Sequence, residues 1–254
     1  MRKSFHIAGV LVLTLALVPS LLYSVTLADG QAVLDKVDQQ TNFKGTDFSA
    51  LMTMITEDPT AGIEKTKVLQ FRSDDDDKFL MLIQEPAVKK GQGYLMVDGN
   101  LWFYDPESRK FSHTSINDQF NGTDANNSDF NASSVAEDYR VAAIEETKLG
   151  SYAVYLMTLE ALNNEVTYQT QRLWVTINGN LVLKSEDYSS GGRLMRTSYY
   201  PTYAKAGDNV VPTKMIFVDE LVEGKKTTIT ISDISVKDIA DSVFTKSYVE
   251  LVNK

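Results

Sequence analysis

Histidine is the side chain most used for proton transfer near neutral pH, and the 254-residue chain has two, His6 and His113. His6 falls in an N-terminal stretch that we interpret below as a signal, which leaves His113 for any imidazole chemistry. A Ser-His-Asp hydrolase would have to use it, yet the chain contains no Gly-x-Ser-x-Gly nucleophile elbow. We therefore interpret His113 as an exposed residue at a strand end, without a catalytic role.

Metal and cofactor chemistry also finds little support. The chain has no cysteine, so disulfides, thiolate metal sites and Cys nucleophiles are excluded. A zinc site on one histidine would need its other ligands from carboxylates alone. The four consecutive aspartates at residues 74–77 lack the spaced ligands and the glycine of a calcium loop, so we predict a solvated hairpin tip there. No Gly-rich phosphate loop is present, and we expect no cofactor.

Carboxylates are abundant, with 34 Asp and Glu against 25 Lys and Arg and a net charge of −9. This balance argues against nucleic acid as a partner, because phosphate binding requires a basic face. A hydrolase built on two carboxylates stays open as an alternative. Among 34 acids some pair always has a suitable spacing, so we select no catalytic residue and do not expect an enzyme.

The N-terminus has the order of a secretory signal. Arg2 and Lys3 precede an apolar run over residues 7–18, then Pro19, then small residues that end at Ala28. We predict cleavage after Ala28, which leaves a single domain over residues 29–254 with a net charge of −11. The alternative is a signal retained as a membrane anchor. No cysteine follows it for lipid attachment, so we expect an exported, unanchored protein in a bacterial periplasm.

The remainder is mainly β with a few helices, an α+β chain. An amphipathic helix is predicted over residues 29–43 and a short one over 133–138, with Ser133 or Ser134 as its cap. Asp98 and Gly99 between two apolar runs predict a hairpin. Alternating or apolar runs bounded by turn residues predict antiparallel strands at 48–55, 64–72, 79–83, 94–97, 101–104, around 111, and at 153–159, 171–177, 181–188, 193–200, 211–219 and 225–236. Such a succession of hairpins is typical of a large curved sheet or open barrel.

A positive functional signal is the supply of flexible apolar side chains. Seven methionines and both tryptophans are spread over successive predicted strands. Methionine suits irregular apolar surfaces that accept varied ligands, although each residue singly could be ordinary core. A sheet with few helices to cover it leaves a concavity, and a ligand with acyl chains would fill it.

Several stretches in order resemble the outer-membrane lipoprotein-sorting family, the LolA/LolB-like periplasmic proteins, especially the branch associated with RND/MMPL-type exporters. They are residues 93–95, 100–106, 122–130, 172–175, 192–195, 211–215, 226–228 and 241–245. Residues 122–130 are similar to the Gly-Ser-Asp-Phe lid segment of that family in a longer and more polar form.

The resemblance implies a half-open antiparallel β-barrel closed by a helical lid. It also implies a carrier of lipoprotein acyl chains or lipids toward the outer membrane, in the manner of LolA, monomeric and with an inner-membrane RND/MMPL-type transporter as a candidate partner. The alternative is a non-catalytic module that docks on such an exporter. The predicted lid residues are Phe120, Asp129 and Phe130. Strand alternation predicts the cavity residues as Met52, Met54, Leu95, Val97, Trp102, Tyr104, Trp174, Met195, Met215 and Phe217.

Overall fold

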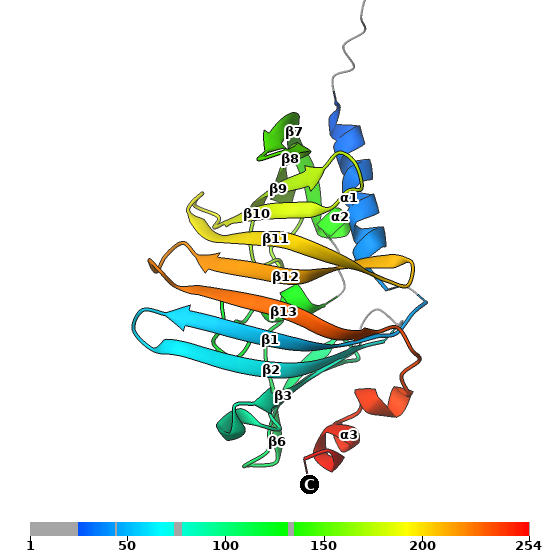
Figure 1. Ribbon diagram of the computed structural model, residues 1–254, viewed down its shortest axis with the longest axis vertical. Helices are drawn as coiled ribbons and strands as arrows, with labels where there is room; N and C mark the ends of the chain where they lie inside the picture. The colour runs from blue at the N-terminus through cyan, green and yellow to red at the C-terminus, as the bar shows by residue number, and fades with distance from the viewer. Residues whose placement is uncertain (1–24, 44, 74–77, 132–134, 254) are drawn as a thin grey trace, which may run out of the picture.

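The computed structural model describes residues 25–43, 45–73, 78–131 and 135–253. The aspartates of residues 74–77 and the predicted cap at residues 133–134 lie outside the described residues. The predicted signal also lies outside them, except for residues 25–28. The described residues form one 13-stranded antiparallel sheet with short helices (Figure 1). Its strands are β1 (Phe48–Asp58), β2 (Gly62–Arg72), β3 (Phe79–Glu85), β4 (Gly93–Val97), β5 (Asn100–Asp105), β6 (Lys110–His113), β7 (Tyr139–Leu149), β8 (Tyr152–Ala161), β9 (Thr170–Thr176), β10 (Val182–Tyr188), β11 (Leu194–Ala206), β12 (Asn209–Asp219) and β13 (Lys226–Ser235).

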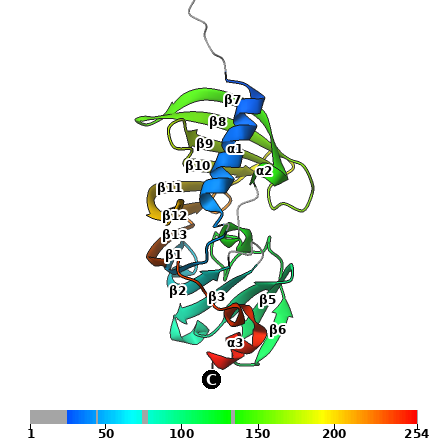
Figure 2. The ribbon, with the colours of Figure 1, turned by 90° about the vertical axis from the view of Figure 1, so that its right-hand side faces the viewer.

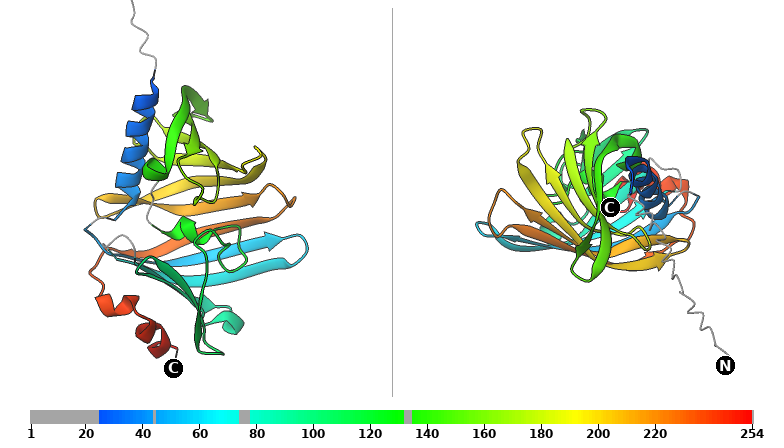
Figure 3. Two further views of the ribbon diagram at one scale, coloured as in Figure 1. Left: turned by 180° about the vertical axis from the view of Figure 1, so that it is seen from behind. Right: turned by 90° about the horizontal axis from the view of Figure 1, so that it is seen from above.

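Two runs of consecutive hairpins make up the sheet. Strands β1 to β6 form one half and β7 to β13 the other, and the first and last strands pair in the middle, Met52 opposite Ile231. The sheet is not closed into a barrel, since β6 and β7 are its two edges. Seen from the side and from above, it is strongly twisted and curved (Figures 2 and 3).

The hairpin predicted at Asp98 and Gly99 joins β4 to β5. Both residues have positive φ, +51° and +69°, as a tight hairpin turn requires. The predicted strands are all present, most of them longer by one to three residues. Strand β7 was not predicted, because charged residues on both of its faces, such as Glu145 and Lys148, interrupt its apolar alternation.

Helix α1 (Leu27–Thr41) begins two residues before the predicted helix and ends two residues earlier. Thr26 caps it, and the Asp29 side chain completes a capping box in place of acting as the cap itself. Gly30 faces β7, where a Cβ atom would lie 3.0 Å from a Val141 methyl group. The helix therefore packs close against one half of the sheet, which Figure 2 shows. Helix α2 (Val135–Asp138) follows near it.

Three apolar clusters hold the sheet. One lies on the inner face of β1–β5 and β11–β13 and includes Met54, Phe79 and Phe217. A second lies between α1 and strands β7–β10 and includes Leu34 and Met157. In the described residues no helix is long and apolar enough to cross a membrane.

The third cluster covers the outer face of β3–β5. The C-terminal segment, made of η3 (Asp241–Phe244) and α3 (Lys246–Leu251), places Phe244 and Val249 against Leu80, Leu82 and Leu95. Strand β3 is consequently buried on both faces, as its uninterrupted apolar run predicts.

Candidate functional site

A cavity of about 470 Å³ lies between the two inner apolar clusters, within the 300–1,000 Å³ usual for small-molecule sites. Val37 of α1 and Leu173 of β9 contribute from one cluster, and Met52, Met215 and Ile231 from the other. Further wall comes from residues 116–117 and 128–131, in the chain between β6 and α2, and from residues 163 and 165–168 in the loop between β8 and β9. We call residues 114–131 the inner segment, since it lies against the inner face of the sheet.

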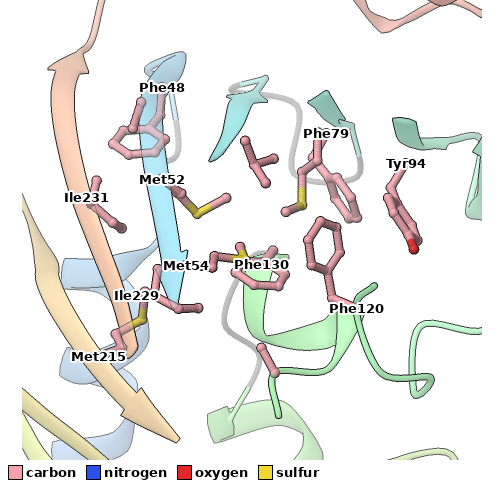
Figure 4. Packing of buried hydrophobic residues seen from close by; sticks show 14 of the residues in the cluster. Phe48, Met52, Met54, Phe79, Tyr94, Phe120, Phe130, Met215, Ile229 and Ile231 are labelled. Carbon is pink, nitrogen blue, oxygen red and sulfur yellow. The ribbon is translucent and has the colours of Figure 1, made fainter. Parts of the chain in front are cut away.

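Two phenylalanines anchor the inner segment. Phe120 is fully buried, with its ring 4.6 Å from Tyr94 and 5.1 Å from Phe130. Figure 4 shows both rings turned toward the sheet, Phe130 beside Met54 and Phe120 beside Phe79 and Tyr94. Phe130 also lines the cavity. Apolar contacts alone would hold this segment as part of the core.

Polar contacts also fix it. The Gln70 side chain of β2 donates to the Phe130 carbonyl at 3.2 Å. The Asn117 side chain donates to the Glu165 carbonyl at 2.8 Å, in the loop between β8 and β9. The segment itself contains η2 (Asn127–Phe130), a single 3₁₀ turn closed by a capping box between Asn126 and Asp129.

The strongest polar anchor is Arg196 of β11, which lines the cavity and is only 6% exposed. Its Nη1 and Nη2 donate to the two carboxylate oxygens of Asp129 at 2.5 and 3.0 Å. Its Nε donates to Asp187 of β10 at 2.8 Å, and Nη1 also reaches the Asp124 carbonyl at 3.3 Å. The guanidinium therefore joins the sheet to the inner segment at two points.

Aromatic rings flank the guanidinium. Its carbon lies 5.1 Å from the Tyr168 ring centre and 4.8 Å from that of Phe217, close enough for cation–π attraction. Burial alone would lower the pKa of Arg196, but the Asp129 and Asp187 carboxylates raise it above its ordinary value. Burial raises the pKa of Asp187, which Arg196 opposes. Arg196 is therefore charged and sits between two carboxylates.

Asp124 makes a second polar anchor. Its carboxylate accepts from the Thr227 hydroxyl of β13 at 2.8 Å. The Asp124 backbone N–H donates to the Thr227 hydroxyl oxygen at 3.0 Å. Lys225 Nζ lies 3.3 Å from the same carboxylate. Burial tends to lower the pKa of Lys225, but Asp124 raises it overall.

Tyrosines give the cavity a partly polar lining. Tyr139 and Tyr203 donate to the Tyr168 and Val182 carbonyls at 2.8 and 2.5 Å. Burial raises the pKa of Tyr200 to about 12, so this side chain is neutral at physiological pH. The site therefore offers apolar walls, neutral hydroxyl groups and the Arg196 charge cluster, with Arg72, Asp138 and Glu165 as further charged residues of the lining.

The structure brings part of the predicted site together. Met52, Met215, Phe217, Asp129 and Phe130 line the cavity. Met54 and Phe120 are buried in the adjoining inner cluster without being part of the lining.

Five predicted cavity residues lie on the other face of the sheet, which corrects their face assignment. Leu95, Val97 and Tyr104 pack beneath the C-terminal segment. Trp102 carries Lys246 over its ring at 3.2 Å, and Trp174 carries Lys184 at 4.3 Å. A sixth, Met195, lies at an irregularity between the Asp187–Arg196 and Tyr188–Leu194 pairs and does not line the cavity. A shift of one residue inverts a strand's faces, and aromatic character does not show which face is inside.

The charge cluster was missed from sequence. Asp187 and Arg196 are directly opposite on the β10–β11 hairpin, so strand pairing across the turn at residues 189–193 could have suggested them as a pair. Asp129 was selected only as a lid residue. His113 lies exposed at the end of β6 with its ring 5.4 Å from Trp102, and it does not line this cavity. No cluster of three or more possible metal ligands occurs in the residues described.

Known structures share this architecture. A LolA superfamily protein from Nitrosomonas europaea is 27% identical, with a TM-score of 0.74 over 86% of this chain and 98% of that one. A putative outer membrane lipoprotein-sorting protein domain from Vibrio parahaemolyticus is 19% identical, with a TM-score of 0.77 over 89% and 100%. A DUF1329 family protein from Desulfovibrio piger is also 19% identical, with a TM-score of 0.77 over 88% and 98%. The fold is therefore that of the LolA-like lipoprotein-sorting proteins, which confirms the resemblance.

A family model described as "Uncharacterized protein" matches residues 75–251, more than half of the chain, and the chain belongs to that family. The comparison with curated proteins found no match.

Proposed function

We propose that this protein is a periplasmic carrier that holds an acyl chain of a lipid or lipoprotein in the 470 Å³ cavity. The observation that supports this most is the position of the cavity, between two apolar clusters and behind a segment that is not part of the sheet. The LolA-like fold supports the same assignment. No step of this function requires catalysis.

In this proposal the sheet is a half-open barrel and the inner segment is its lid. The lid is a loop with one 3₁₀ turn, where the family resemblance implied a helix. Each methylene moved out of water contributes about 0.8 kcal/mol, so a chain of about 15 carbons contributes roughly 12 kcal/mol. That is enough to compensate for displacing the two phenylalanines of the lid from their contacts. An RND/MMPL-type partner, a monomeric state and signal cleavage stay predictions.

Native mass spectrometry of protein purified without detergent tests the proposal, together with uptake of a fluorescent fatty acid. We expect bound lipid and saturable uptake. Val182→Phe should reduce uptake by filling the cavity, because Val182 lines it. Leu183→Phe is the matched control, since the neighbouring Leu183 is outside the lining. Folded protein that carries no lipid and takes up no fatty acid would overturn the proposal.

A further inference from the structure

The Arg196 fork has the geometry of a carboxylate-binding site, and Asp129 occupies it. Two parallel N–H···O bonds of 2.5 and 3.0 Å join Nη1 and Nη2 to both oxygens of one carboxylate. Such bidentate pairing is how arginine recognises carboxylates and phosphates in general. The Phe217 ring of β12 and the Asp187 carboxylate of β10 hold the guanidinium from the sheet. The Tyr168 ring also flanks it, and its hydroxyl accepts from the Asn126 side chain of the inner segment at 3.1 Å. Two of these three supports therefore do not depend on the inner segment.

The two carboxylates at Arg196 differ in how they are held. Asp187 lies on β10, directly opposite Arg196 in the β10–β11 ladder, and its other oxygen accepts from Gln171 of β9 at 3.0 Å. Asp187 therefore remains with Arg196 wherever the inner segment goes. Asp129 belongs to the inner segment, and its further contact is the Asn126 backbone N–H of its own turn. When the segment moves, Asp129 leaves with it.

When Asp129 departs, the Nη1 and Nη2 groups of Arg196 lose their carboxylate acceptor. Arg196 and Asp187 would remain as a neutral pair, with the Nη1 and Nη2 donors unpaired at the wall of an apolar cavity. Buried donors without acceptors cost free energy, and more so on a charged group. A neutral ligand would leave most of that cost in place, whereas an oxyanion would restore both hydrogen bonds.

We propose that the cargo is an amphiphile with an anionic head, a carboxylate or a phosphate, that replaces Asp129 on the Arg196 fork while its chain fills the cavity. This inference rests on the proposed carrier function. Arg196 and Asp129 both line the cavity, so a head bound at the fork has its chain directed among the apolar walls. The inner segment then acts as an internal substitute ligand that keeps the fork occupied when the carrier is empty.

Isothermal titration of the delipidated protein with three probes of equal chain length tests this: dodecanoate, dodecyl phosphate and dodecanol. We expect either anion to bind at least tenfold more tightly than dodecanol, and comparison of the two anions tells a free fatty acid from a phosphorylated lipid head. Asp129→Asn should increase the affinity for the anions several-fold more than that for dodecanol, because a neutral amide competes for the fork less strongly than a carboxylate.

Loss of Arg196 alone would leave the Asp187 and Asp129 carboxylates without their cation, so the test uses Arg196→Gln with Asp187→Asn and Asp129→Asn, which removes all three charges. The triple variant should bind all three probes with similar affinity while it retains its far-ultraviolet circular dichroism. Equal binding of anions and dodecanol by the wild type would overturn the inference and leave the carrier function standing. A preference for anions that survives in the triple variant would also overturn it. Failure to bind any probe would overturn the carrier function itself.

Discussion

Arg196 of β11 and Asp129 of the inner segment form a bidentate ion pair across 67 residues of sequence, with both bonds partly buried. Apart from a 3.3 Å contact with the Asp124 carbonyl, it is the link through which Arg196 holds this segment. The pair therefore joins the folded sheet to the part of the chain that must move if the cavity is to be filled.

Asp129→Asn should destabilise the protein by about 2–4 kcal/mol, because it leaves the fork with a weaker acceptor in a buried site. Urea unfolding measures the loss. Hydrogen exchange at residues 118–130 should accelerate more than exchange in β12. Glu57→Gln is the control, since the exposed Glu57–Lys226 pair should contribute no more than about 1 kcal/mol. Equal losses in the two variants would argue against a structural role for the Arg196 pair.

Gly30→Leu should separate α1 from β7 and cost about 1–3 kcal/mol. A Cβ atom added at this position would lie 3.0 Å from Val141 and 3.1 Å from Ile144, so a leucine side chain would overpack the contact between the helix and the strand. Thermal unfolding measures the effect. Ala32→Leu on the exposed side of the same helix is the control and should leave the melting temperature unchanged. A melting temperature that does not fall in the Gly30 variant would contradict the observed packing of α1.

Phe244→Ala should cost about 3–5 kcal/mol through the cavity it leaves under the C-terminal segment. Fatty-acid uptake by the protein that remains folded should not change, because Phe244 lies on the outer face. Leu251→Ala serves as the control, because the Leu251 side chain is 60% exposed. Reduced uptake in a folded Phe244 variant would show that the outer face contributes to binding.

Stability should fall as the pH rises above about 10. The pKa of Tyr200 is raised to about 12 in the fold, so between about pH 10 and 12 the folded state retains a proton that the unfolded state loses. The stabilisation is complete below the unfolded pKa of about 10 and is lost as the pH approaches 12. Tyr200→Phe should flatten this slope by up to about 1.4 kcal/mol per pH unit, as measured by urea unfolding at pH 9, 10 and 11. Tyr152→Phe, at the exposed start of β8, is the matched control for the loss of a tyrosine hydroxyl.

The sequence predicted the elements more reliably than their faces. The Asp98-Gly99 turn and the apolar run of β3 identified their structures, because each is determined by local residues. Strand faces depend on what covers them. Trp102 and Trp174 look like core residues, yet each lies beneath a lysine on the outer face.

The charge cluster could not be identified from the sequence and became apparent in the fold. Asp129, Asp187 and Arg196 are far apart or separated by a turn, and in a chain with 34 acids no single carboxylate is distinctive. Their meeting depends on the inner segment's path across the sheet, which neither periodicity nor local propensity specifies. Phe120 and Phe130 are both buried, as isolated aromatics in a polar stretch must be, and their role as lid residues stays a prediction.

The pairing of β1 with β13 sets the order in which the protein can be assembled. Residue 52 of β1 pairs with residue 231 of β13. One edge of β1 therefore cannot form its hydrogen bonds until β13 has been synthesised. The outer face of β3 is covered later still, when Phe244 and Val249 have been synthesised. Contacts of such long sequence separation form slowly. The sheet should therefore not be complete in a nascent chain until the residues up to Val249 have been synthesised.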